Sequence, residues 1–139
     1  EPKYEFGVPE GPGRLDADNE WLVISGYPAD RFNVKVIRFD ELANGNLKSI
    51  PGYDSFPQSA IITDIGFFIT QQGDNQVVGW RSVDAALAGE MPINILGSGE
   101  GSKAANAIKM ANSVAWDGSH LWVGEFKFST RMLGFKPTV

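Results

Sequence analysis

The only histidine of the chain, His120, has neighbours in the sequence that could form a proton relay with it. Asp117 precedes it by three positions and Ser119 by one, so the residue types of a Ser-His-Asp triad occur together. In such a triad the imidazole is the general base that takes the proton of the serine hydroxyl. Neither Ser119 nor Ser113 stands in a nucleophile-elbow pattern, however. We therefore interpret His120 as a solvent-exposed residue that flanks the Asp117-Gly118 turn.

The composition excludes several other kinds of chemistry. The 139 residues include no cysteine and one histidine, which excludes thiolate catalysis and zinc sites built from cysteines or several histidines. The formal net charge of −5 is opposite in sign to that of a typical nucleic-acid binder and disfavours anionic membranes. No apolar run approaches the ~18 residues that cross a bilayer. We expect one domain that binds neither nucleic acid nor a membrane.

Three segments of the chain share a plan of strand, tight turn and strand. In the clearest of them the turn is Asp117-Gly118, a pair that supplies the positive φ angles of a hairpin. Matched positions in the three segments are 45 and 54 residues apart (67 − 22 and 121 − 67). The hairpins are predicted over residues 14–27, 59–72 and 113–126, and a third strand ending in an aromatic residue over 34–39, 75–80 and 130–135.

Each repeat also has a fourth strand, and one of these strands is displaced to the other end of the chain. Residues 47–52 and 93–97 follow the first two units, whereas Tyr4–Val8 precedes the first unit. With the strands of a unit named A to D, the order is D, ABCD, ABCD, ABC. A period of about 40–50 residues with four short strands is typical of propeller blades. An ordinary antiparallel sandwich of about twelve strands is the alternative.

We therefore predict an all-β fold of three four-stranded β-propeller blades. Blade 1 covers residues 9–52, blade 2 covers 53–97, and blade 3 covers 98–139 together with 1–8.

The second and third units resemble those of the NHL-repeat and related six-bladed β-propellers. The segment Asp74-Asn-Gln-Val-Val-Gly-Trp80, followed by a linker and Glu90–Gly97, is similar to the family's "D-x-x-N-x-R-V" strand and its later "V-L-G" strand. Asp117–Phe126 and Thr130–Phe135 resemble the family's "D-G-x-L-W-V-A-D…N-R-V-x-x-F" core. These are scaffold motifs, so the resemblance implies a fold and no particular reaction.

Three blades make up half of the six-bladed ring that the resemblance implies. The end faces of an open wedge would be apolar and exposed, which is rare on a soluble monomer. We expect either a homodimer joined head-to-tail around a two-fold axis or a part of a longer propeller chain. In a homodimer, Tyr4–Val8 of one chain could add a fourth strand beside residues 130–135 of its partner.

Polar residues on the loops between strands are the candidate ligand-binding residues. In a propeller the D–A and B–C loops surround the mouth of the central channel, where a small molecule or a protein could bind. Glu125 is the strongest candidate, because it ends a second strand where an apolar residue could stand. Ordinary loop polarity is the alternative, and Asp74 and Arg131 could instead cap turns. The full set is Glu10, Arg14, Gln58, Asp74, Asn112, Glu125 and Arg131.

Two functions follow from these observations. Intact blade motifs without an evident catalytic set predict a binding scaffold that needs no cofactor. The resemblance implies an alternative, because related six-bladed propellers include lactonases and esterases that bind calcium through Glu, Asn and Asp around the channel. Under either function, the long loop over residues 98–112 is expected to be a lid at the channel mouth or part of the dimer contact.

Overall fold

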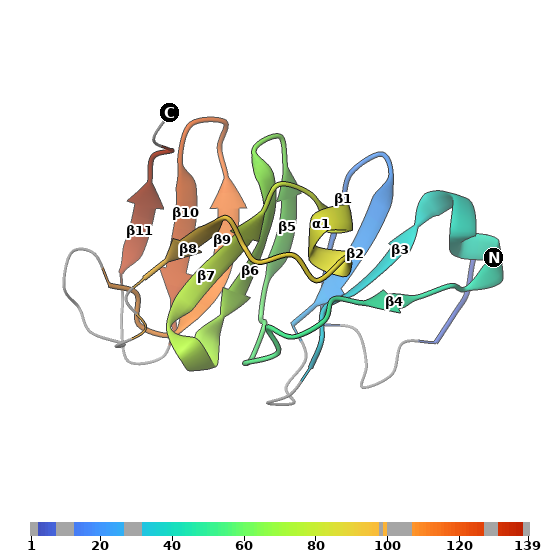
Figure 1. Cartoon of the computed structure of the whole chain (residues 1–139), viewed down its shortest axis with the longest axis horizontal. Helices are drawn as coiled ribbons and strands as arrows, with labels where there is room; N and C mark the ends of the chain where they lie inside the picture. Colours follow the sequence, from blue (N-terminus) through green and yellow to red (C-terminus); the bar gives the residue numbers. More distant parts are fainter. Residues whose placement is uncertain are drawn as a thin grey trace.

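The chain is an all-β protein made of three small antiparallel sheets (Figure 1). The computed structural model describes residues 3–7, 13–26, 32–97, 99, 107–126 and 131–137. The predicted all-β class is confirmed, and within these ranges one short α-helix, α1 (Val83–Leu87), is present. No helix in the described ranges has the length and apolar character needed to span a membrane.

The first sheet is a meander of four strands: β1 (Arg14–Ala17), β2 (Trp21–Ser25), β3 (Lys35–Arg38) and β4 (Lys48–Ser49). The Asp18 carboxylate closes the first hairpin, because it accepts hydrogen bonds from the N–H groups of Glu20 and Trp21. Leu22 pairs with Ile37 across β2 and β3. The aromatic Phe39, expected at the end of this third strand, instead begins the 3₁₀ helix η1 (Phe39–Asn44).

The second sheet has the same topology, with β5 (Ala60–Thr63), β6 (Gly66–Gln71), β7 (Gln76–Trp80) and β8 (Asn94–Leu96). Gly66 opens β6 with a φ of 148°, and a Cβ at this position would lie 2.4 Å from the Trp80 carbonyl oxygen. A glycine is therefore required where the two strands meet. A 3₁₀ turn, η2 (Gln72–Asp74), joins β6 to β7, and α1 joins β7 to β8.

The third sheet has three strands in the described part of the chain: β9 (Ala111–Trp116), β10 (Leu121–Glu125) and β11 (Met132–Phe135). The Asp117-Gly118 turn joins β9 to β10, and Gly118 has the positive φ of 97° that such a turn requires. Asp117 Oδ1 accepts hydrogen bonds from the N–H groups of Ser119 and His120, both at 2.7 Å. Hydrogen bonds and a glycine within the turn thus determine where this hairpin reverses direction.

The strand predicted over Tyr4–Val8 is absent from residues 3–7, which form no strand. Phe6 lies beside Gly45 at the outer end of the first sheet, whereas β11 lies at the opposite end of the molecule (Figure 1). Val8 lies outside the described residues. A strand needs a hydrogen-bonding neighbour, and the expected neighbour β11 is at the far end of the same chain.

The apolar core consists of two layers, one on each face of the second sheet. Successive strand residues point to opposite faces, so Phe67 and Ile69 of β6 pack toward the first sheet and Phe68 packs toward the third. All residues of β6 are buried. The sheets are therefore stacked face to face in chain order, with the second sheet in the middle.

Candidate functional site

Arg14, at the start of β1, brings the first strands of all three sheets together. Its Nη1 donates a hydrogen bond to the carbonyl oxygen of Gln58, at 3.1 Å, and another to that of Asn112, at 2.9 Å. Gln58 lies in the segment that leads into β5, and Asn112 is the second residue of β9. Three residues that the sequence singled out thus meet at one edge of the molecule, Gln58 and Asn112 through their backbone oxygens.

The local backbone places Arg14 at this edge. The N–H of Gly13 donates to the Ser25 carbonyl oxygen at 3.1 Å and so extends the β1–β2 pairing by one residue. A Cβ on Gly13 would lie 2.0 Å from the Gly26 carbonyl oxygen, so only glycine fits there. The close approach of these two glycines fixes the point at which the chain enters β1.

Asp16 makes a second connection from the same strand. Its Oδ2 accepts a hydrogen bond of 2.8 Å from the N–H of Ile62, on the edge of β5. Arg14 and Asp16 are two positions apart and so project from the same face of β1. The Arg14 guanidinium donates to backbone carbonyl oxygens, and the Asp16 carboxylate accepts from a backbone N–H. Both side chains thus provide hydrogen-bond partners for backbone groups of the neighbouring sheets. Sequence reasoning missed Asp16, because its partner is 46 residues away.

Glu125 and Arg131 form an ion pair between the ends of β10 and β11. The Glu125 side chain is fully buried, and Arg131 donates to it through Nε at 2.7 Å and Nη2 at 2.8 Å. These hydrogen bonds raise the pKa of Arg131 above its usual value. The N–H of Lys109 also donates to Glu125, and Arg131 Nη2 donates to the Ala107 oxygen. The pair therefore anchors the segment before β9, and a ligand would have to displace these donors to reach Glu125.

Asp74 ends η2, and its neighbour Asn75 forms a hydrogen bond to the segment before β9. Asn75 has a left-handed backbone with a φ of 57°, and its Oδ1 accepts a 2.9 Å hydrogen bond from the N–H of Met110. This contact joins the second sheet to the segment before β9. The sequence carries a signal for this turn, because asparagine tolerates the left-handed conformation better than most residues.

The remaining predicted site residues lie partly outside the described residues. Glu10 lies outside them, as does most of the predicted lid over residues 98–112, of which residues 99 and 107–112 are described. Within the described ranges, no three His, Cys, Asp or Glu side chains are grouped as a metal ion would need.

The residues around His120 form a turn rather than a relay. Ser119 Oγ lies 2.8 Å from His120 Nδ1, and Asp117 Oδ2 lies 4.0 Å from that same nitrogen. A triad needs the serine and the carboxylate on different ring nitrogens. Asp117 Oδ2 instead accepts a hydrogen bond from Trp122 Nε1 at 2.9 Å. This bond, followed by those from the backbone of His120 and Ser119, holds the pKa of Asp117 well below its usual range.

Comparison with known proteins adds no family to this description. No protein-family model matches the chain, and no curated protein matches it. The likeness to NHL-repeat propellers therefore stays a prediction made from the motifs.

Proposed function

We propose that the chain is a non-catalytic binding scaffold whose three sheets are β-propeller blades. In this proposal three blades are half of a six-bladed ring, which a second copy completes, and the loops around the ring's centre bind a small molecule or a protein. The observation that carries the proposal is the pair of hydrogen bonds that Arg14 Nη1 donates to the carbonyl oxygens of Gln58 and Asn112. These hydrogen bonds support a common centre for the three blades, because they link the first strands of the three sheets at one edge of the molecule.

The end faces of the stack support closure by a second copy. On the third sheet, Trp122 and Met132 lie on the face turned away from the core and are 37% and 67% exposed. On the first sheet, Leu15 lies on the face opposite to Val23 and is 65% exposed. Apolar side chains on both end faces favour burial against a partner. Head-to-tail pairing of the first and third sheets would cover both.

The mass in solution tests the ring. Sedimentation or light scattering at 10–100 µM, about the working range for associations of micromolar affinity, is expected to give twice the 15.1 kDa of the chain. A monomer throughout this range would contradict the ring. Substitution of Trp122 by Glu, on the third sheet's outer face, should shift the mass toward the monomer. Arg81→Glu, at an exposed position directly after β7, is the control and should leave the mass unchanged.

The position of the binding surface can be mapped by NMR. Glucose, glycylglycine and succinate serve as probes of three ligand classes in ¹H–¹⁵N spectra of the full chain. We expect shifts for at least one probe to cluster on Gln58, Asn112 and their neighbours, at the Arg14 edge. Shifts confined to the hairpin turns at the other end, around Ile65 and Asp117, would contradict this placement, as would the absence of any shift.

The calcium-dependent hydrolase stays a prediction with a separate test. It requires that Ca²⁺ stabilise the wild-type chain against heat and that Glu125→Gln remove this gain. It also requires turnover of a simple lactone. We expect neither effect, because both Glu125 oxygens already accept hydrogen bonds from Arg131. Calcium-dependent turnover that Glu125→Gln abolishes would replace the scaffold proposal with this one.

A further inference from the structure

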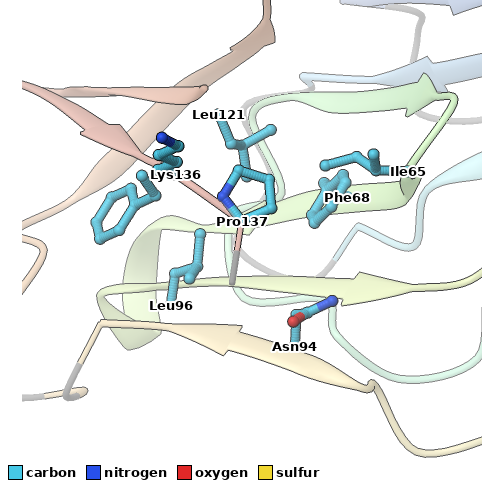
Figure 2. A pocket seen from close by; sticks show the side chains of 8 residues that line it. Ile65, Phe68, Asn94, Leu96, Leu121, Lys136 and Pro137 are labelled. Atoms are coloured by element: carbon cyan, nitrogen blue, oxygen red, sulfur yellow. The ribbon is translucent and has the colours of Figure 1, made fainter. Parts of the chain in front are cut away.

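A cavity of about 300 Å³ lies between the second and third sheets (Figure 2). Its walls are mostly apolar, with Phe68 from β6, Leu96 from β8, Leu121 from β10 and Phe135 from β11. Lys136, which directly follows β11, also lines it. The cavity is therefore a gap between two sheets that are otherwise packed against each other.

The corresponding gap between the first and second sheets is filled. There α1 packs Val83, Ala85 and Ala86 against the cluster that contains Trp80, and Trp80 itself is 1% exposed. Trp80 pairs with Phe67 at the start of β6, just as Phe135 pairs with Leu121 at the start of β10. The two aromatic residues thus hold equivalent places, yet Phe135 faces a cavity. Among the described residues, no segment takes the place of α1 beside Phe135.

The outer edge of β11 also lacks a neighbour among the described residues. In the first two sheets a fourth strand pairs with the third: β4 with β3, and β8 with β7. β11 pairs with β10 alone in the described part of the chain. Its outer backbone N–H and C=O groups are thus available to an added strand. The free edge borders the cavity. One added strand could therefore pair with the backbone of β11 and also place side chains in the cavity.

The N-terminal segment has the pattern that such a strand needs. Tyr4 and Phe6 alternate with Glu5 and Gly7, so in an extended conformation both aromatic rings would project from one face. Tyr4 is 45% exposed where it lies now, and Phe6 is half-buried beside Gly45. The segment's present position, at the end of the molecule away from β11, suits pairing with another copy rather than with its own sheet (Figure 1).

The register of the second sheet predicts which residues would meet. In that sheet Val78 pairs with Ile95 and Gly79 pairs with Asn94. We match Gly134 of β11 with Gly79 of β7, and Glu5 with Asn94 of β8. The same register would then place Phe6 opposite Leu133, Glu5 opposite Gly134 and Tyr4 opposite Phe135. Because Phe135 lines the cavity, the Tyr4 ring would enter it from the same face. Glu5 would lie diagonal to Lys136, which has no ion pair within the described residues, so the charges are complementary.

We propose that residues 4–7 of one copy add to the free edge of β11 in a second copy, with Tyr4 in the apolar cavity between the second and third sheets. This inference rests on the proposed function, because it gives the mode of pairing for the ring. It also assigns an occupant to the cavity: an aromatic strand of the same protein. The backbone hydrogen bonds would supply affinity, and the cavity would select the aromatic side chain.

Disulfide trapping tests the register, since the chain has no cysteine of its own. Gly7 has open space around its Cβ position and Met132 is 67% exposed, so both accept a cysteine. In the proposed register they are directly opposite, within the 4.4–6.8 Å between Cα atoms that a disulfide usually spans. A mixture of the Gly7→Cys and Met132→Cys chains should therefore form a covalent heterodimer on mild oxidation. Met91→Cys, 77% exposed on another part of the surface, replaces Met132→Cys in the control and should not crosslink.

Variants of Tyr4 test the occupant of the cavity in the full-length chain. Tyr4→Ser is expected to weaken dimerisation at least tenfold, and Tyr4→Phe to preserve it, because the ring and not the hydroxyl fills the cavity. A dimer that tolerates Tyr4→Ser and gives no Gly7–Met132 crosslink overturns this inference and leaves the ring standing. A crosslink accompanied by open-ended oligomers supports strand addition and contradicts the closed ring. A monomer without the crosslink overturns both.

Discussion

Arg14 Nη1 lies 2.9 Å from the carbonyl oxygen of Asn112, although the two residues are 98 positions apart in the chain. The same nitrogen reaches the carbonyl oxygen of Gln58, so one side chain of the first sheet contacts both other sheets. Asp16 adds a bond to the Ile62 N–H from the same face of β1. These contacts set the relative positions of the three sheets at the edge where the candidate loops begin.

Removing the Arg14 guanidinium should loosen this edge. Arg14→Ala is expected to lower the free energy of unfolding by about 1–2 kcal/mol, as for the loss of charge-assisted hydrogen bonds at an exposed position. Urea denaturation followed by tryptophan fluorescence measures the change. Arg81→Ala is the matched control, because Arg81 is 69% exposed and its ion pair with Glu90 lies on the surface. Such pairs contribute about 0–1 kcal/mol, so an equal loss in both variants would contradict the special role of Arg14.

Neutralising Glu125 should destabilise the third sheet. Glu125→Gln leaves Arg131 beside an amide that cannot accept both of its hydrogen bonds. We expect a loss of about 2–3 kcal/mol in the free energy of unfolding, somewhat below the usual cost of breaking a buried pair, because the Arg131 side chain is 25% exposed. Glu90→Gln, in the exposed pair with Arg81, is the control and should cost less than about 1 kcal/mol. Hydrogen exchange at the Lys109 N–H should also speed up in Glu125→Gln alone.

Asp117 should make the protein sensitive to acid. Its folded-state pKa is lowered, chiefly by the Trp122 Nε1 hydrogen bond, so it stabilises the fold fully above the ordinary carboxyl pKa of 3.8. This contribution is lost as the pH falls below that value, because protonation then favours the unfolded chain. Trp122→Phe should therefore flatten the fall in stability between pH 5 and pH 2, a range that spans the ordinary carboxyl pKa values.

Trp116→Phe serves as the control for the acid experiment, because it also removes an indole but leaves the Asp117–Trp122 bond in place. Thermal unfolding measured across the acidic range gives the comparison. Identical slopes for the wild type and Trp122→Phe would show that this hydrogen bond does not govern the acid dependence.

The local elements could be read from the sequence because their causes are local. The apolar run over residues 121–123 and the Asp117-Gly118 pair are enough to predict a hairpin, and both act within a few residues. The third strand of the first sheet shows where this reasoning fails. An aromatic end was expected at Phe39, but the register pairs Leu22 with Ile37 and leaves Phe39 to begin η1. Register depends on which faces are buried, which the pattern alone does not state.

By itself, the sequence determined the all-β class and the hairpins, because strand periodicity and turn residues act over short distances. Only the tertiary structure decided how the candidate residues are used. Stacking of the sheets turned Arg14 toward the carbonyl oxygens of Gln58 and Asn112 and buried Glu125 against Arg131. It also left residues 4–7 without a strand partner in the described part of the chain, although their pattern predicts one. Contacts between residues this far apart depend on how whole sheets pack, and no local pattern encodes that packing.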